Sequence, residues 1–170
     1  TYTATGFIPN AGVCCTPVLQ AQFPVGTRFT YSFTLDTAAA GTTDGSPLNM
    51  HYDNGLVSSS GSLGSYVFST GSGPLQVGKQ PNYDKFEVLS SNVTGAPVGG
   101  SRPYSVAFVL RDDTRTALSG GAVPTSLNLS AFSRLGDIAS ENQGLGLQKL
   151  NLIFGDLGEI ITLVTGLVLT

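Results

Sequence analysis

Hydrophobic and polar residues alternate along two segments of this 170-residue chain. From Arg28 to Leu35, large apolar side chains occupy every second position, and Arg, Thr or Ser stands between them. The segment from Tyr104 to Leu110 repeats this pattern. Because successive side chains of a strand point to opposite faces, the alternation predicts half-buried β-strands. Weaker forms of the pattern predict further strands at 2–7, 66–69, 86–89, 126–129 and 147–154.

Clusters of turn-forming residues separate the expected strands, for example from Asp53 to Gly55 and from Gly71 to Pro74. The stretches 37–46 and 58–65, rich in Ser, Thr and Gly, are interpreted as solvated loops. No stretch has a convincing helical period. Short strands and turns at this spacing predict an all-β fold, a single-domain antiparallel β-sandwich of jelly-roll-like form over residues 1–170.

The C-terminal segment 160–170 is uncharged, rich in β-branched residues and apolar on both alternating faces. It is too short for a membrane-spanning helix, which needs about 20 such residues. An apolar strand at an exposed edge of a sheet would pair with other chains. We therefore expect it either to take part in assembly, on the next subunit's sheet or beside a donated 2–7 segment, or to be a central strand of its own sheet. The expected assembly residues are Ile161, Leu163, Val164, Leu167 and Leu169.

Composition narrows the class of protein. Charged residues make up 11% of the chain and hydrophobic residues 41%, which excludes a disordered polyampholyte. The net charge is −3 and the 8 basic residues are scattered, so we expect no nucleic-acid partner. No basic amphipathic segment predicts membrane binding. The Lys-poor surface, rich in Ser, Thr and Gly, is typical of exported proteins, and we interpret Thr1 as a mature N-terminus.

Several segments occur in a recognisable order. Phe23 to Thr27 leads into Phe29 to Thr37, a Gly- and Ser-rich middle follows, and Ala117 to Pro124 precedes Leu127 to Phe132. This order resembles the exported domain of bacterial PEP-CTERM proteins, although Thr27 stands where they usually have an acidic residue. Their Pro-Glu-Pro motif, transmembrane helix and basic tail do not occur in the sequence. The resemblance implies an exported surface or matrix protein with no shared enzymatic activity.

The cysteines of the chain, Cys14 and Cys15, are adjacent. Consecutive Cα atoms lie about 3.8 Å apart, which is closer than the roughly 4.4–6.8 Å of most disulfides. A bond between them would be strained and would close almost no loop. Three alternatives stay open: this vicinal disulfide, pairing of each cysteine with another subunit, and two reduced, packed thiols. A zinc site is not expected, because His51 is the only histidine.

The sequence contains no recognisable catalytic constellation. No G-x-S-x-G elbow accompanies His51, and the carboxylates are too dispersed to nominate a glycosidase pair. Asp53, Asp112 and Asp113 have oxygens suited to Ca²⁺, but no complete calcium-loop motif surrounds them. We therefore expect no enzyme and no cofactor, with calcium as the alternative.

Two functions remain after these exclusions. The first is a secreted structural protein of the cell surface or extracellular matrix, self-assembling into filaments or a surface layer through its terminal strands. The alternative is a β-sandwich module that binds carbohydrate or calcium. The chain has no Trp and its Tyr and Phe residues mostly follow the strand alternation, so an exposed aromatic platform for polysaccharide is not expected.

Overall fold

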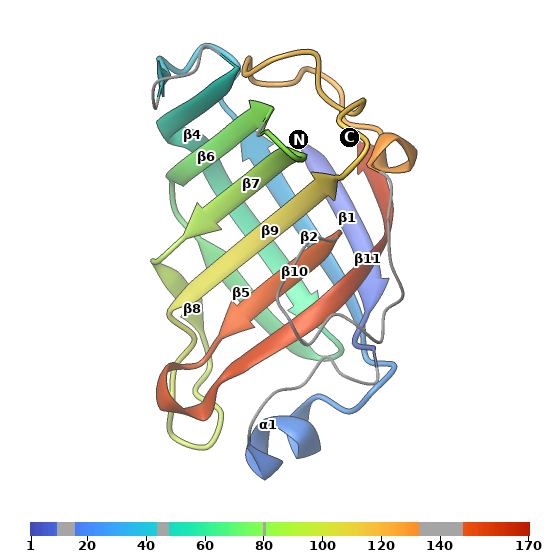
Figure 1. Cartoon of the computed structure of the whole chain (residues 1–170). Coiled ribbons are helices and arrows are strands. Elements are labelled where there is room, and N and C mark those ends of the chain that lie inside the picture. The colour runs from blue at the N-terminus through green and yellow to red at the C-terminus, as the bar shows by residue number, and fades with distance from the viewer. Residues whose placement is uncertain (10–15, 44–47, 80, 133–147) are drawn as a thin grey trace.

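The structure is a computed structural model, and it describes residues 1–9, 16–43, 48–79, 81–132 and 148–170. Within these ranges, eleven strands form one antiparallel sheet (Figure 1). The strands are β1 (Tyr2–Phe7), β2 (Arg28–Leu35), β3 (Thr42–Thr43), β4 (Asn49–Leu63), β5 (Tyr66–Thr70), β6 (Gly73–Lys79), β7 (Asp84–Ser90), β8 (Val93–Gly95), β9 (Ser105–Asp112), β10 (Lys149–Ile153) and β11 (Glu159–Leu169). The helical segments are α1 (Pro17–Gln22) and the short 3-10 turns η1 (Leu129–Ala131) and η3 (Gly155–Leu157).

The sheet curves into a nearly closed, barrel-like form. The strands follow the order β2-β1-β11-β10-β9-β7-β6-β4, and pairing of β2 with β4 joins the two ends of this series. The all-β antiparallel class predicted from the sequence is thus confirmed. The expected pair of packed sheets is instead one curved sheet. Alternation predicts which face of a strand is buried, whereas the pairing of β1 with β11 depends on contacts between the two ends of the chain.

Aromatic side chains fill the middle of this sheet. Phe33 and Phe108 have ring centroids 5.0 Å apart, and Tyr31 lies against both of them. All of these rings are fully buried. Burial of a large apolar side chain is worth roughly 1.5–3 kcal/mol relative to its exposure. The alternation from Arg28 to Leu35, now strand β2, therefore supplies a main part of the core.

The interpretation of 58–65 as a solvated loop is wrong, because residues up to Leu63 belong to β4, the longest strand. This part of β4 pairs with β2 on one side and with β5 on the other. Gly61 is required there: a Cβ at this position would lie 2.5 Å from the Phe68 ring. The segment resembles a loop in composition, yet it is a strand in which Gly61 makes room for the Phe68 ring of the neighbouring strand β5.

The helix α1 covers one end of the sheet (Figure 1). Its Leu19 is fully buried, and Phe23 just beyond it contacts the rings of Tyr66 and Phe154, with centroid distances of 5.4 and 5.8 Å. No helix was expected at this point, because 6 residues are too few to show a helical period. No helix in the described part of the chain is long and apolar enough to cross a membrane.

Candidate functional site

The opposite end of the sheet is covered by the segment 113–132, which connects β9 to the end of η1 (Figure 1). Before η1 it contains no helix or strand. Loops of more than about 12–15 residues without secondary structure are uncommon in compact domains and are usually functional or disordered. Side chains of the sheet hold this one at several points. It is therefore the candidate functional site. The strand expected at 126–129 falls within this segment, and that prediction is wrong.

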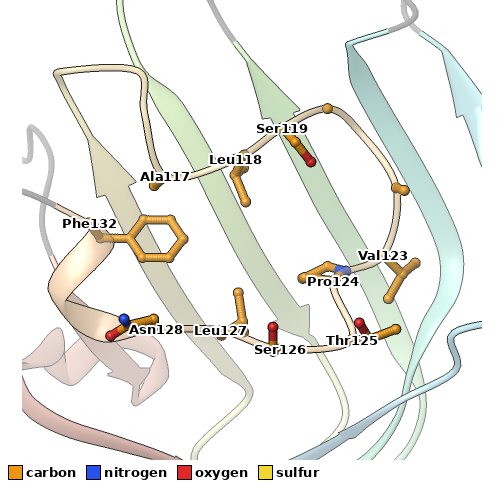
Figure 2. A pocket seen from close by; sticks show the side chains of 12 residues that line it. Ala117, Leu118, Ser119, Val123, Pro124, Thr125, Ser126, Leu127, Asn128 and Phe132 are labelled. Atoms are coloured by element: carbon orange, nitrogen blue, oxygen red, sulfur yellow. The ribbon is translucent and has the colours of Figure 1, made fainter.

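The segment doubles back on itself and encloses a hollow of about 420 Å³. Figure 2 shows that Leu118 and Leu127 point toward each other from the two arms of the loop, that the hydroxyl groups of Ser119 and Ser126 point into the space between the arms, and that the Phe132 ring closes one side. The residues lining the hollow are Ala117, Leu118, Ser119, Gly120, Ala122, Val123, Pro124, Thr125, Ser126, Leu127, Asn128 and Phe132.

The first turn of the segment is organised by Asp112, the last residue of β9. Its side chain is fully buried and faces the loop. Oδ1 accepts hydrogen bonds from the backbone N–H and the hydroxyl of Thr114, at 3.0 and 2.7 Å. Oδ2 accepts from the backbone N–H groups of Thr116 and Ala117, at 2.6 and 2.9 Å. Hydrogen bonds to an ionised acceptor are stronger than neutral ones, so this carboxylate fixes the turn.

An ion pair between neighbouring strands holds the next part of the loop. Lys79 Nζ lies 3.3 Å from Oδ2 of the buried Asp84 and donates to the carbonyl oxygens of Arg115 and Leu118, at 2.8 and 2.6 Å. The backbone N–H of Leu118 donates in turn to Asp84 Oδ2. The other carboxylate oxygen, Oδ1, is buried and receives no hydrogen bond from the described residues. Because such an oxygen costs about 1–3 kcal/mol, the pair positions the loop more than it stabilises the fold.

Two tyrosine hydroxyls hold the far part of the loop. Tyr52 donates to the carbonyl oxygen of Gly121 at 2.8 Å, and Tyr2 donates to that of Pro124 at 3.3 Å. Burial raises the pKa of Tyr2, so its hydroxyl stays protonated and able to donate. At the end of the segment, the side-chain amide of Gln148 donates to the carbonyl oxygens of Leu129 and Phe132. The walls of the hollow are therefore fixed from five strands, β1, β4, β6, β7 and β9, and from the chain before β10.

The chemistry of the hollow is that of neutral groups. Its lining residues carry aliphatic, aromatic, hydroxyl and amide side chains, and none of them is ionisable. Acid–base and nucleophilic catalysis need a titratable group within hydrogen-bond reach of the substrate. The described lining offers binding by apolar contact and by neutral hydrogen bonds.

The predicted calcium candidates do not come together. Asp53 is exposed on β4, while Asp112 ends β9, and β6 and β7 lie between these strands. The carboxylate of Asp113 forms an ion pair with Arg111 at 2.5 Å. In the described ranges no group of three or more His, Cys, Asp or Glu residues is placed to hold a metal ion. Both cysteines, Cys14 and Cys15, lie outside the described residues.

The predicted assembly strand is β11, and it is paired on both sides within the chain, with β1 and with β10. Its main-chain groups are thus engaged, as in the alternative of a central strand. Val164 is buried, Leu167 packs partly against the core and Leu169 is exposed. The backbones of Ile161 and Leu163 pair with β10, and Leu163 also pairs with β1.

A second surface feature is the outer face of one half of the sheet. Thr3 pairs with Ser32, Ser32 with Ser60, Ser60 with Ser69, and Ser69 with Thr94, so that one row of hydroxyl groups crosses β1, β2, β4, β5 and β8. We define the hydroxyl face as the outward side chains Thr3, Thr5, Thr30, Ser32, Thr34, Ser58, Ser60, Ser62, Ser69 and Thr94.

The other half of the sheet has a charged outer face. Lys85 and Glu87 form an ion pair on β7, and Arg111 lies over the ring of Tyr83 at 4.1 Å from its centroid. Sequence reasoning missed both the hydroxyl face and the Lys79–Asp84 pair. A signal existed for the first: no charged residue occurs from 54 to 78. The ion pair joins residues on two strands, and only their register brings them together.

Comparison with protein families, with curated proteins and with solved structures finds no match for this chain.

Proposed function

We propose that this protein is a secreted, non-catalytic structural protein of the cell surface or extracellular matrix that associates with copies of itself. The observation that carries this proposal is the uncharged hydroxyl face. The neutral lining of the hollow supports the non-catalytic part of the proposal. The resemblance to exported domains of PEP-CTERM proteins stays a prediction and agrees with the same setting.

The hydroxyl face shares one property with the centre of a protein interface, because none of its side chains is charged. Interface centres differ from the rest of a surface mainly by their lack of charged residues. Hydroxyl groups can donate and accept, so two such faces can exchange hydrogen bonds without burying an unpaired charge. Two exposed valines lie on strands of this half of the sheet, Val57 with 49% exposure and Val67 with 68%. Val168, which is 61% exposed, lies opposite Thr3 on the adjoining strand β11. They add apolar area that association would bury.

Electrostatic interactions also favour the hydroxyl face over the charged face as the surface through which two copies associate. Each copy has a net charge of −3, so two copies repel each other at long range. Contact through the charged face would remove the Lys85–Glu87 ion pair from water, and the desolvation of a buried pair can cost more than the attraction between its charges returns. Contact through the hydroxyl face avoids this cost. In this arrangement β11 stays in its own sheet and contributes outward side chains near its end, such as Val168, instead of exchanging between subunits.

The test is sedimentation velocity over a range of protein concentrations, with lysine placed on either half of the sheet. We expect the wild-type protein to sediment faster as its concentration rises, and Ser60→Lys and Val67→Lys to remain monomeric. Leu89→Lys, at an exposed position on β7 in the charged half, is the matched control and should associate as the wild type does. A wild-type protein that stays monomeric at every concentration would contradict self-association. Equal association of all variants would contradict the role of the hydroxyl face.

A further inference from the structure

We propose that the hollow enclosed by the segment 113–132 is a binding site for one neutral sugar unit of a polysaccharide. This inference goes beyond the proposed structural role and does not depend on self-association. It rests on three properties of the hollow: its rigid walls, its mixed apolar and hydroxyl lining, and its lack of charge.

The walls are fixed before any ligand arrives. The carboxylates of Asp112 and Asp84 hold the start of the loop, and the hydroxyls of Tyr52 and Tyr2 hold its far part. A site that is already ordered loses little conformational freedom on binding, so more of the contact energy appears as affinity. The volume of about 420 Å³ is within the range of about 300–1,000 Å³ that is usual for small-molecule sites.

The lining matches the two kinds of surface that a sugar ring presents. A pyranose has C–H groups on its faces and hydroxyl groups around its edge. Leu118, Leu127 and Phe132 give the inner side of the hollow small areas of apolar surface, since they belong to the protein core and are 7%, 8% and 2% exposed. Ser119 and Ser126 are exposed and direct their hydroxyls into the hollow from its two arms (Figure 2). A sugar ring in the hollow thus meets apolar carbon on the inner side and hydroxyl groups at its edge.

The absence of charge selects among ligands. A carboxylate or phosphate entering the hollow would lose hydration and would find no cationic side chain in the lining to replace it, which disfavours binding. A wholly apolar ligand would displace water from Ser119 and Ser126 without replacing its hydrogen bonds. A neutral sugar avoids both costs. The hollow is therefore suited to a neutral polysaccharide rather than to an acidic one.

The experiment is an NMR titration of the whole protein with maltohexaose, cellohexaose and mannohexaose, and with hexagalacturonate as the acidic probe. We expect at least one neutral probe to shift the amide signals of residues 117–128, and the acidic probe to shift them less at equal concentration. The double variant Ser119→Ala/Ser126→Ala removes the two serine hydroxyls that point into the hollow. Loss of two neutral hydrogen bonds predicts an affinity lower by about tenfold or more.

The matched control is Ser58→Ala/Ser60→Ala, which removes two hydroxyls from the hydroxyl face and should bind the neutral probe as the wild type does. The proposal would be overturned by the lack of any shift with the neutral probes, by equal binding of hexagalacturonate, or by unchanged affinity in the Ser119/Ser126 variant. Shifts confined to the hydroxyl face would also overturn it. Sedimentation measures self-association separately, so a failure here leaves the proposed structural role untouched.

Discussion

The two ends of the sheet are covered in different ways. At one end α1 places Leu19 and Phe23 against an apolar surface, and the contacts are between buried rings and aliphatic groups. At the other end the segment 113–132 is held through Asp84, Asp112 and tyrosine hydroxyls. Apolar burial is not directional, whereas hydrogen bonds fix distances and angles. The α1 end is therefore suited to stability, and the loop end to holding a shaped hollow.

The largest expected effect is at the α1 end. Phe23→Ala removes a ring that is 1% exposed and contacts both Tyr66 and Phe154. We expect the free energy of unfolding to fall by about 3–5 kcal/mol, as for other buried aromatic truncations. Urea denaturation followed by circular dichroism measures it. Val25→Ala is the control, because this side chain is 55% exposed and should matter little. A loss below about 1 kcal/mol for Phe23→Ala would contradict the role given to α1.

A smaller effect is expected from the ion pair at the loop end. Asp84→Ala leaves the Lys79 ammonium without its carboxylate and removes the acceptor of the Leu118 N–H. Breaking a buried pair costs about 3–5 kcal/mol, and we expect about 2–4 kcal/mol here because Lys79 is 18% exposed and can reach water. Hydrogen exchange should accelerate in the loop around Leu118 while the α1 end keeps its protection.

The control for the loop end is Asp113→Ala, which removes a partly exposed ion pair with Arg111. Such pairs contribute about 0–1 kcal/mol. If Asp84→Ala and Asp113→Ala were equally mild, or if exchange rose equally at both ends of the sheet, the distinction between the two ends would fail.

The dependence of the free energy of unfolding on alkaline pH tests the core between the two ends of the sheet. Burial raises the pKa of Tyr31 far above its ordinary value of about 10, and it raises the pKa of Tyr66 and Tyr2 as well. Above pH 10 the unfolded chain therefore binds fewer protons than the folded protein, so the free energy of unfolding falls as the pH rises. The slope is about 1.4 kcal/mol per pH unit for each tyrosine that stays protonated in the fold.

Chemical denaturation at several pH values between 8 and 11.5 measures this slope. Tyr31→Phe keeps the ring and removes the titrating hydroxyl, and the former partner Ser59 keeps its hydrogen bond to Thr70. The slope of this variant above pH 10 should be shallower than that of the wild type. A slope that is the same with and without the hydroxyl would show that Tyr31 ionises in the folded protein as it does in the unfolded chain.

The smallest expected effect is that of a single hydrogen bond to the loop. Tyr52→Phe removes the donor to the Gly121 carbonyl oxygen and keeps the buried ring. A neutral hydrogen bond contributes about 0.5–1.5 kcal/mol, and we expect a loss of that size with increased hydrogen exchange near Gly121. A loss of several kcal/mol would mean that the loop supports the whole fold, contrary to the comparison of the two ends.

The alternation of apolar and polar residues correctly predicts strands that are half-buried. The strands predicted at Tyr2–Phe7 and Arg28–Leu35 are β1 and β2 with those same bounds. The same pattern gives a wrong prediction in β4 around Gly61, where a small residue is needed. Gly61 has no side chain, and the ring of Phe68 on β5 occupies the space next to it. The pattern also missed α1, because one and a half turns of helix are stabilised by packing and not by propensity.

The candidate site was only partly accessible to sequence reasoning. Asp112 was singled out for its oxygens, but as a calcium ligand, whereas the structure shows it binding the N–H groups of the turn that follows it. Lys79 and Asp84 were not singled out, since a Lys and an Asp five residues apart are unremarkable until β6 and β7 pair. The hydroxyls of Tyr2 and Tyr52 donate hydrogen bonds to carbonyl oxygens more than sixty residues away in sequence, and no local sequence pattern indicates such contacts.

Alternation and composition are enough to predict an all-β protein with little charge, because they show which side chains must be buried away from water. The closing of the strands into one curved sheet, the position of β11 between β1 and β10, and the hollow within the segment 113–132 become visible only in the folded chain. Burial depends on each residue's own chemistry. Register and the closing of the sheet depend on pairs of residues that are far apart in the chain.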